Sequence, residues 1–331
     1  MGLKPCFKVM ANGSDISNVI EELFEYISVT DQTGIESDTC EISLIDDPVT
    51  PIAIPPRGAE MEILMGYDDA LVPMGKYIVD EIELEGPPEK MVIRGRAAAQ
   101  TASKSGQLSM QTQKSRTWAK DTTIEATVRK IAKEHNLDFM VSDSLKAVKL
   151  PQTSQSDESD LSFLFRLAKR YDAICKPAGA KLLFVKRGEI QLDVLSLTRY
   201  QLSKWSMVRS SRDSTGTVIA YWHEKAKAKK HEVKLGDGEP VRRLRHAYAD
   251  ADSAKAGAQA ALDKSKRDED KLSITLPGDP YISAESPVTI SEIRDGINGD
   301  WIVDSVTHKI DKSVGFNTSL EAVKNLKDEE S

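Results

Sequence analysis

Hydrophobic and polar residues alternate in the first hundred residues of the chain, which is the pattern of half-buried β-strands. The alternation is clearest at residues 39–44, and we expect further strands at 6–10, 16–20 and 23–29. Three prolines between residues 51 and 56 exclude a central strand, because proline cannot donate to a strand ladder. We therefore expect an N-terminal region built mainly from β-strands, with a loop at the prolines.

The middle of the chain changes to helical spacing. Residues Thr122 to Glu125 form a capping-box pattern at the start of a helix whose apolar positions fall on one face. The residues expected on that face are Ile124, Val128, Ile131 and Ala132, with Asn136 as the stop. A strand at 138–141 should follow.

A second helix is expected to open at residues 156–158, where acids suit the positive end of the helix dipole. Its apolar stripe is Leu161, Leu164, Phe165 and Ala168. Residues 173–176 and 181–186 then predict a hairpin. The Ser-, Gln- and Thr-rich segment 101–113 predicts a polar connector that precedes this small α/β module.

The last part of the chain returns to alternation. Strands are expected at 205–211, 216–223, 232–235 and 272–276, and an alanine-rich helix at 247–264. That helix has acids near its start and lysines near its end, which suits its dipole. The sequence therefore predicts an α+β protein, mainly β.

One short segment occurs twice, once in each β region. Residues 75–85 and 299–309 share the order glycine, aromatic residue, Ile-Val-Asp and then a β-branched residue after one intervening position. Expected strands flank both copies in the same order, so a strand–loop–strand–loop–strand unit is predicted to be repeated. The six residues that define the structural repeat are Gly75, Tyr77, Asp80, Gly299, Trp301 and Asp304.

Composition and charge argue against several classes of protein. The 331 residues are 40% hydrophobic and 29% charged, with a formal net charge of −7, which is an ordinary globular balance. No apolar run has the length of a membrane span, and the start lacks the apolar core of a secretory signal. The acidic balance argues against stable binding to duplex DNA. The three cysteines are far apart and predict neither disulfides nor a zinc site.

Candidate catalytic chemistry is weak. The five histidines form no metalloprotease helix, and no serine-hydrolase elbow or phosphate-binding glycine loop occurs. Asp80 and Asp304 would be paired carboxylates if they met across a cleft, but a repeated structural role at a strand end is the better interpretation. We expect no catalytic residues, no cofactor and no metal.

The order and spacing of several motifs resemble those of the phage late control protein D family. The motifs lie at 123–137 and 155–168, at Tyr221-Trp222, at 276–280 and at 299–308. Members of that family are baseplate hub proteins of contractile phage tails, similar to the base of type VI secretion spike proteins. The resemblance implies two tube-like antiparallel β-barrel domains, with the small α/β module inserted between them.

The resemblance also implies an assembly. Three copies would form a ring with pseudo-sixfold symmetry that joins the tail tube to the central spike, alongside other baseplate proteins. The expected location is the virion tail, and the bacterial host cytoplasm during assembly. DNA would only pass through the ring, where a negative lumen would repel its phosphates. We expect no membrane partner, and a separate protein as the spike.

The expected domains are a first tube-like barrel at 1–110, the α/β module at 111–190, a second barrel with the alanine-rich helix at 191–325, and a charged tail at 326–331. Two alternatives remain open. A tail-associated cell-wall hydrolase would need a cleft with two acids or a metal site, and a host-surface binding module would favour exposed aromatic clusters.

Overall fold

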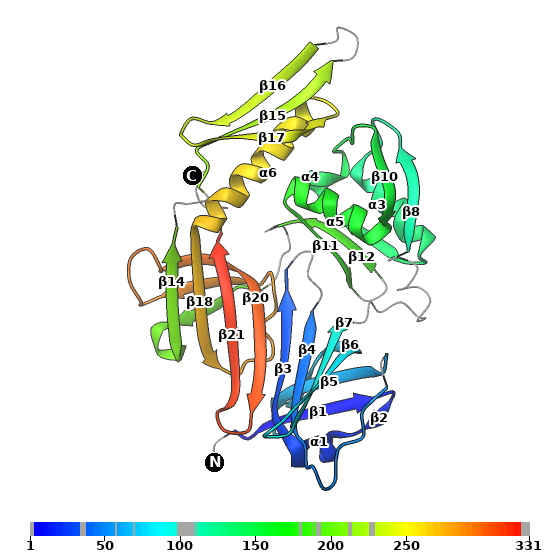
Figure 1. The fold of residues 1–331 in the computed structure, drawn as a ribbon. Helices are drawn as coiled ribbons and strands as arrows, with labels where there is room; N and C mark the ends of the chain where they lie inside the picture. The colour runs from blue at the N-terminus through cyan, green and yellow to red at the C-terminus, as the bar shows by residue number, and fades with distance from the viewer. Residues whose placement is uncertain are drawn as a thin grey trace. The chain divides into compact units, whose positions relative to one another are not determined.

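The computed structural model (Figure 1) shows a mainly β protein with several helices. It describes residues 3–33, 38–56, 58–68, 70–97, 110, 112–178, 181–187, 189, 193–210, 214–224 and 229–325. The chain divides into two compact units. Unit 1 comprises Met1–Ala98, Leu192–Met207 and Leu272–Ala322, and unit 2 comprises Ala99–Gln191, Val208–Lys271 and Val323–Ser331.

Unit 1 begins with a set of six main strands in the spatial order β3-β4-β7-β6-β5-β1. Consecutive strands in this order pair antiparallel. Their bounds are β1 (Pro5–Ala11), β3 (Phe24–Gln32), β4 (Thr39–Ile45), β5 (Glu60–Tyr67), β6 (Ala70–Glu85) and β7 (Lys90–Ala97). The short strand β2 (Ser14–Asp15) pairs with β1.

A second set of six strands has the order β14-β18-β21-β20-β19-β13. Their bounds are β13 (Leu195–Thr198), β14 (Lys204–Arg209), β18 (Asp270–Pro277), β19 (Pro287–Ser291), β20 (Gly299–Asp311) and β21 (Gly315–Lys324). The 3₁₀ helix η1 (Arg199–Gln201) separates β13 from β14. The two sets match strand for strand, except that β13 pairs parallel with β19 whereas β1 pairs antiparallel with β5.

The two sets join through β20 and β3, which pair antiparallel from Ser305↔Gln32 to Asp311↔Tyr26. All thirteen strands therefore form one hydrogen-bonded sheet, as Figure 1 shows for the adjacent ribbons of β20 and β3. Within the described residues, no recorded strand pair closes either set into a ring. The closure of two separate barrels thus stays a prediction.

Each set has its own hydrophobic core. Tyr77 and Val79 belong to the core of the first set, and Trp301 and Val303 belong to that of the second. The strand expected at residues 16–20 is wrong, because Ser17–Leu23 forms helix α1 instead. Ile20 is the buried residue of α1 and Leu23 packs partly against the same core, so a short apolar run that also suited a strand packs here as a helix.

Unit 2 contains the α/β module. Its elements are β8 (Gln113–Trp118), α3 (Ile124–Glu134), β9 (Asp138–Val141), α4 (Asp143–Lys146), β10 (Thr153–Ser159), α5 (Asp160–Tyr171), β11 (Ala173–Ala178) and β12 (Lys181–Lys186). β12 pairs with both β9 and β11, and β8 pairs with β10. The buried face of the first helix, the strand at 138–141 and the hairpin are confirmed. The first helix is capped by Thr123, which accepts from Ala126 N, so Glu125 does not occupy the capping-box position that was expected of it.

Two other details of this module differ from the sequence-based expectation. The second helix begins at Asp160 and not at 156–158, because Asp157 has a positive φ of 48° and Ser159 caps the helix by accepting from Ser162 N. The polar connector ends earlier than expected, because Gln113 already lies in β8. Most of 101–113 lies outside the described residues.

Unit 2 also contains a three-stranded sheet and a long helix. The sheet has the order β16-β15-β17, from β15 (Thr217–Glu224), β16 (Lys229–Gly236) and β17 (Val241–Tyr248). Helix α6 (Ala251–Glu269) packs small residues against it, with Ala254 and Ala258 fully buried. A methyl group at Gly257 would come within 2.2 Å of the Tyr248 ring, so glycine permits this close approach.

The alanine-rich helix expected in the second β domain therefore belongs to unit 2, together with residues of the α/β module. It starts at Ala251 rather than at 247, since residues 247 and 248 complete β17. Among the described residues, no helix is long and apolar enough to cross a membrane. The charged tail 326–331 lies outside the described residues.

Candidate functional site

The two copies of the repeated segment form hairpins with the same register. In both, the strand that carries the repeat glycine pairs antiparallel with the strand before it. The matched pairs are Glu60↔Ile78, Met61↔Tyr77, Glu62↔Lys76 and Ile63↔Gly75 in β5–β6, and Pro287↔Ile302, Val288↔Trp301, Thr289↔Asp300 and Ile290↔Gly299 in β19–β20. Equal register means that every side chain has a counterpart facing the same way.

The first residue of each copy adopts a backbone conformation that favours glycine. Gly75 has φ +137° and Gly299 has φ +124°. L-residues rarely occupy this region, because their Cβ collides with the backbone. At Gly75 a Cβ would also come within 2.8 Å of the Tyr77 hydroxyl. Glycine at these two positions is thus a steric requirement.

The aromatic residue of each copy is buried and donates a hydrogen bond to a backbone carbonyl that precedes it in the chain. Tyr77 is 1% exposed and its hydroxyl donates to the Met74 carbonyl at 2.9 Å. Trp301 is fully buried and its Nε1–H donates to the Ile297 carbonyl at 2.8 Å. Buried tyrosine and tryptophan usually find such a partner for their polar atom. Two different rings therefore perform the same packing role.

The valine of each copy exchanges two backbone hydrogen bonds with a loop. Val79 N donates to Ala59 O at 3.0 Å, and Val79 O accepts from Gly58 N at 2.8 Å. Val303 N donates to Ser286 O at 3.0 Å, and Val303 O accepts from Glu285 N at 2.9 Å. The matched loop residues Gly58 and Glu285 both have positive φ, +80° and +67°. The likeness thus extends to residues that the sequence motif did not include.

The two aspartates follow directly, where the alternation of buried positions slips by one residue. In β6 the core position after Val79 is Ile82, and in β20 the core position after Val303 is Val306, so two residues instead of one lie between them. In β6 the pairing with β7 skips Asp80, which is a β-bulge. Bulges of this kind turn a strand and increase its twist.

The aspartate carboxylates have different partners. Asp80 pairs with Arg96 at 2.8 Å, and Asp304 accepts from the Thr33 hydroxyl at 2.6 Å. Each carboxylate lies in its own hairpin, and each contact is local to the β-sheet around it. A structural role at the bulge fits these contacts better than acid/base chemistry does.

Beyond the bulge, β20 differs from β6 in its neighbours. Residues Ser305–Asp311 pair with β3, with Val306, His308 and Ile310 buried beneath the junction. On the outer face the hydroxyls of Thr30 and Thr307 lie 2.9 Å apart. The corresponding part of β6, from Glu81 to Glu85, pairs with β7.

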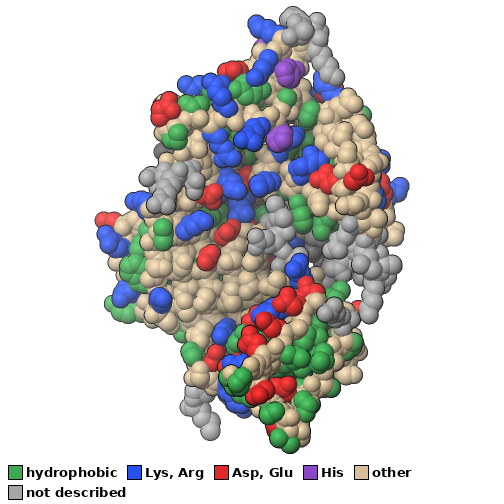
Figure 2. Space-filling model, in the orientation of Figure 1, with side chains coloured by type: hydrophobic (Ala, Val, Ile, Leu, Met, Phe, Trp, Pro, Cys, Tyr) green, Lys and Arg blue, Asp and Glu red, His purple; other side chains and the backbone are tan. Residues whose placement is uncertain are grey.

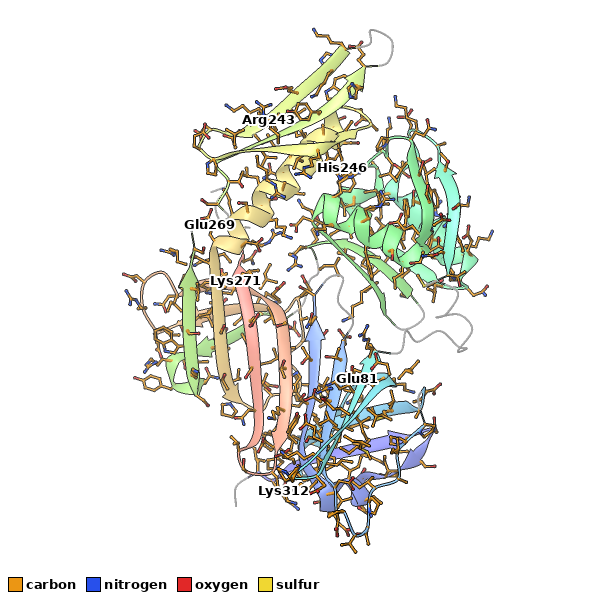
Figure 3. All side chains as sticks on the ribbon, in the orientation of Figure 1. Glu81, Arg243, His246, Glu269, Lys271 and Lys312 are labelled. Carbon is orange, nitrogen blue, oxygen red and sulfur yellow. The ribbon has the colours of Figure 1, made fainter. Side chains whose placement is uncertain are left out.

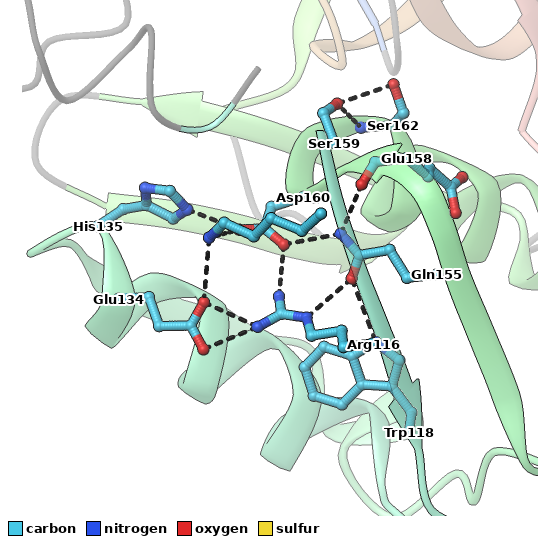
Figure 4. A network of polar contacts seen from close by, with 10 residues as sticks. Arg116, Trp118, Glu134, His135, Gln155, Glu158, Ser159, Asp160 and Ser162 are labelled. Atoms are coloured by element: carbon cyan, nitrogen blue, oxygen red, sulfur yellow. Dashed lines mark hydrogen bonds and ion pairs between the residues drawn. The ribbon is translucent and has the colours of Figure 1, made fainter. Parts of the chain in front are cut away.

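A polar network in the α/β module is the other concentration of ionisable groups (Figure 4). Asp160 is fully buried and lies at its centre. Lys114 Nζ donates to Asp160 at 2.6 Å, His135 Nε2 at 2.8 Å and Gln155 Nε2 at 2.9 Å, and Arg116 pairs with the same carboxylate. Arg116 also bridges both oxygens of Glu134 at 2.8 Å.

The charge state of Asp160 follows from these contacts. Burial by itself would raise the pKa of Asp160, but the hydrogen bonds from Gln155, Lys114 and His135 and the charge of Arg116 together lower it below its ordinary value. The carboxylate is thus held ionised. Buried charges of this kind are stable only when paired and hydrogen-bonded.

Glu134, His135 and Asp160 are also the one group within the described ranges with the ligand types and spacing for a metal ion. Two cations already occupy the carboxylates, so a divalent ion would have to displace Lys114 and Arg116. The guanidinium of Arg116 lies 4.5 Å from the Trp118 ring centre, which fixes it further. The network therefore fits a structural link between β8, β10, α3 and α5.

Sequence reasoning missed this network. Its cations Lys114 and Arg116 lie on β8, directly after the expected polar connector 101–113, where no strand was predicted, and its acid was expected inside a helix that had already begun. A lysine and an arginine alternating with small polar residues ahead of the aromatic Trp118 were the available signal for a strand. His231, one of the five histidines, contacts Glu224 at 3.0 Å and stacks on Trp222.

Proteins with similar sequences include baseplate hub proteins of phages. The model of the family described as phage tail baseplate hub (GPD) matches residues 78–314. A probable baseplate hub protein of Escherichia phage 186 is 31% identical, over 99% of this chain and 95% of its own length.

Two solved structures share the fold. The 43 kDa tail protein of prophage MuSo2 from Shewanella oneidensis has a TM-score of 0.71 at 12% identity, over 97% of this chain and 98% of its own. A type VI secretion system component from E. coli has a TM-score of 0.54 at 10% identity, over 92% and 74%. The resemblance noted in the sequence is confirmed: the chain belongs to the phage tail baseplate hub family.

Proposed function

We propose that this protein is the structural hub of a phage or phage-like tail baseplate, and that three copies form its ring. Membership of the baseplate hub family supports the tail location and a structural, non-enzymatic role. The ring would join the hexameric tail tube to the trimeric central spike and contact other baseplate proteins. During assembly it would be present in the host cytoplasm, and afterwards in the virion.

The observation that carries this proposal is the matched geometry of the hairpins β5–β6 and β19–β20. A threefold assembly offers six equivalent positions only if each chain contributes two similar units. The two hairpins share register, the positive φ of Gly75 and Gly299, and the anchored ring of Tyr77 and Trp301. Two barrel-like β domains at 1–110 and 191–325, with the α/β residues between them, remain part of the proposal.

A cell-wall hydrolase receives less support from the described residues. The deepest carboxylate, Asp160, is bound by cations, and Asp80 is paired with Arg96. DNA is proposed only to pass through the ring. A negative lumen would assist this passage, because it would repel phosphates.

The mass of the purified chain, measured alone and with the adjacent spike protein, tests the proposal. We expect a trimer, either free or once the spike is added. A chain that stays monomeric in both conditions, and that binds neither spike nor tube protein, would overturn the proposed hub. A peptidoglycan-clearing assay distinguishes the hydrolase, for which clearing would be required.

A further inference from the structure

The edge of β6 beyond its bulge corresponds to the edge of β20 that pairs with β3. The hairpins place Glu81–Glu85 in the position of Ser305–Lys309. In β20 this edge is covered by a strand of the other set, from Tyr26 to Gln32. In β6 the same edge has no recorded strand beside it in the part of the chain that the structure describes.

The strand order supplies a matching edge. β3 begins the first set and β14 begins the second, and each pairs on one side with the next strand of its own set. β3 uses its other side to pair with β20. β14 stands at the end of the described sheet, with β18 as its neighbour. The counterpart of the β20–β3 junction would therefore be a β6–β14 junction, which one chain cannot make with itself along this sheet.

We propose that the far edge of β6, Glu81–Glu85, pairs antiparallel with β14 of a second copy of this chain. This inference rests on the proposed three-copy ring and specifies the strands that would close it. In such a ring, β20–β3 junctions within each chain would alternate with β6–β14 junctions between neighbouring chains. An exposed strand edge tends to pair with another chain unless it is protected, and a closed ring removes such edges.

Side-chain exposure agrees with this pairing. Leu84 is 55% exposed, although its counterpart His308 is only 1% exposed beneath the β20–β3 junction. Ile82 lies on the same face and packs partly against the core. On β14 the matching core-side residues Trp205 and Met207 are also only partly buried. A neighbouring strand would cover these apolar groups.

The negative charge of the β6 edge favours β14, rather than β6 of another copy, as its partner strand. The outward residues of β6 past the bulge are Glu81, Glu83 and Glu85. Figure 3 shows Glu81 on this strand, and Figure 2 shows a band of acidic side chains over the same region. Glu81 and Glu83 share a single guanidinium, that of Arg94, which Glu41 also contacts. Two such edges facing each other would repel, since like charges directly opposite each other in a sheet are destabilising.

The outward face of β14 is formed by Lys204, Ser206 and Val208, and its one charge is the positive charge of Lys204, which is exposed at the start of the strand. Arg209 lies on the opposite face by alternation and is held by Asp270 at 2.7 Å. The contact is therefore heterologous, with β6 of one copy against β14 of the next, which is the type that generates rings.

Site-directed cross-linking tests the pairing in the full-length chain. The background is Cys6→Ser, because Cys40 and Cys175 are buried whereas Cys6 is partly exposed. Glu83→Cys and Ser206→Cys are introduced singly and together, and a short bismaleimide is added in the presence of the spike protein. The double variant should form covalent dimers and trimers, whereas each single variant should form none and an equal mixture of the two should form dimers.

The outcomes separate this inference from the proposed function. A trimeric mass without cross-links in the double variant would overturn the pairing and leave the hub intact. Cross-links in Glu83→Cys alone would mean that β6 meets β6, which also overturns it. A monomeric mass with the spike present would overturn both. A Glu83→Cys, Lys234→Cys variant is the matched control, since Lys234 on β16 lies outside the strand edges concerned, and it should not cross-link.

A charge exchange provides a second test that does not need cysteines. Glu81→Lys with Glu83→Lys should weaken the trimer, as should Lys204→Glu. Mixing the two variants should restore part of the assembly, because each junction between unlike chains again joins opposite charges. Melting temperatures near that of the parent chain would show that each variant is folded. Trimers of unchanged stability in both variants would contradict the pairing.

Discussion

Tyr77 and Trp301 occupy the same place in two hairpins far apart in the sequence. Each ring is buried, each lies two residues after a glycine of positive φ, and each donates a hydrogen bond back to a backbone carbonyl that precedes it in the chain. The likeness is therefore one of backbone and hydrogen bonds as well as of sequence. It implies that the two positions respond alike to substitution.

Removing the polar atom of either ring should destabilise unit 1. We expect Tyr77→Phe to cost about 1–3 kcal/mol, because the Met74 carbonyl loses its donor, and Trp301→Phe to cost at least as much, because it also leaves a cavity in the core. Urea denaturation measures the free energy of unfolding. Tyr200→Phe is the control: Tyr200 is 90% exposed, so its change should stay within about 0.5 kcal/mol. A loss at one position without the other would contradict the structural equivalence.

Substitution of Gly75 or of Gly299 should destabilise the protein to a similar extent. Gly75→Ala and Gly299→Ala should each lower the free energy of unfolding by about 1–3 kcal/mol, because alanine is strained at these φ values. Gly86→Ala is a suitable comparison, since its φ is not in the positive range and its nearest neighbour is the flexible Glu89 side chain. Thermal denaturation of the three variants is the measurement, and alanine tolerated at both repeat positions would show that φ is not limiting.

Acid should destabilise unit 1 through His308, which lies on β20 where this strand pairs with β3. Its Nε2–H donates to the Ile282 carbonyl, and Nδ1 accepts from the Thr318 hydroxyl, both at 3.0 Å. Burial lowers the pKa of His308 below its ordinary value, so the folded protein holds the ring neutral while the unfolded chain protonates it near pH 6.5. Since the unfolded state binds more protons, stability falls as the pH drops below about 6.5 and returns as it rises.

Comparing denaturation at pH 7.5 and pH 5.5 tests this pH dependence. His308→Gln should be less stable than the parent at pH 7.5 and should lose less stability on acidification. His223→Gln, at an exposed position of β15, should keep the parent profile. Parent-like sensitivity to acid in the His308 variant would assign the effect to other groups.

Arg116 should be important to the α/β module. Arg116→Met is expected to cost about 1.5–3 kcal/mol, because the buried Asp160 loses a charged donor while Lys114, His135 and Gln155 remain. Arg129→Met is the control, since its i,i+4 pair with Glu125 is exposed and such pairs contribute about 0.5 kcal/mol or less. Equal losses in the two variants, measured in urea, would mean that the network does not stabilise the fold.

Local patterns predicted local structure well in this chain. The buried face from Ile124 to Ala132 was readable because helix periodicity depends on neighbours in sequence. The segment 16–20 was misjudged because a short apolar run suits either a strand or a helix. The start of α5 was placed too early, because acids favour a helix start but Ser159 is the residue that caps it.

Non-local features were beyond sequence patterns. The pairing of β20 with β3 joins residues far apart in the chain, and nothing in either strand marks the other as its partner. The same holds for α6, whose small buried face fits β15 and β17 but could equally have packed on the second strand set. The six repeat residues were identifiable, whereas Gly58 and Glu285, which share their geometry, differ in residue type and gave no signal.

Cryo-electron microscopy of the chain bound to its spike protein tests the central claim most directly. The account predicts a ring of three chains in which β5–β6 and β19–β20 alternate at six nearly equal positions around the axis. The two hairpins should superpose on each other after a rotation of about one sixth of a turn, as two similar units in each of three chains require. A ring of six chains, or a trimer with only one kind of hairpin facing the axis, would contradict it.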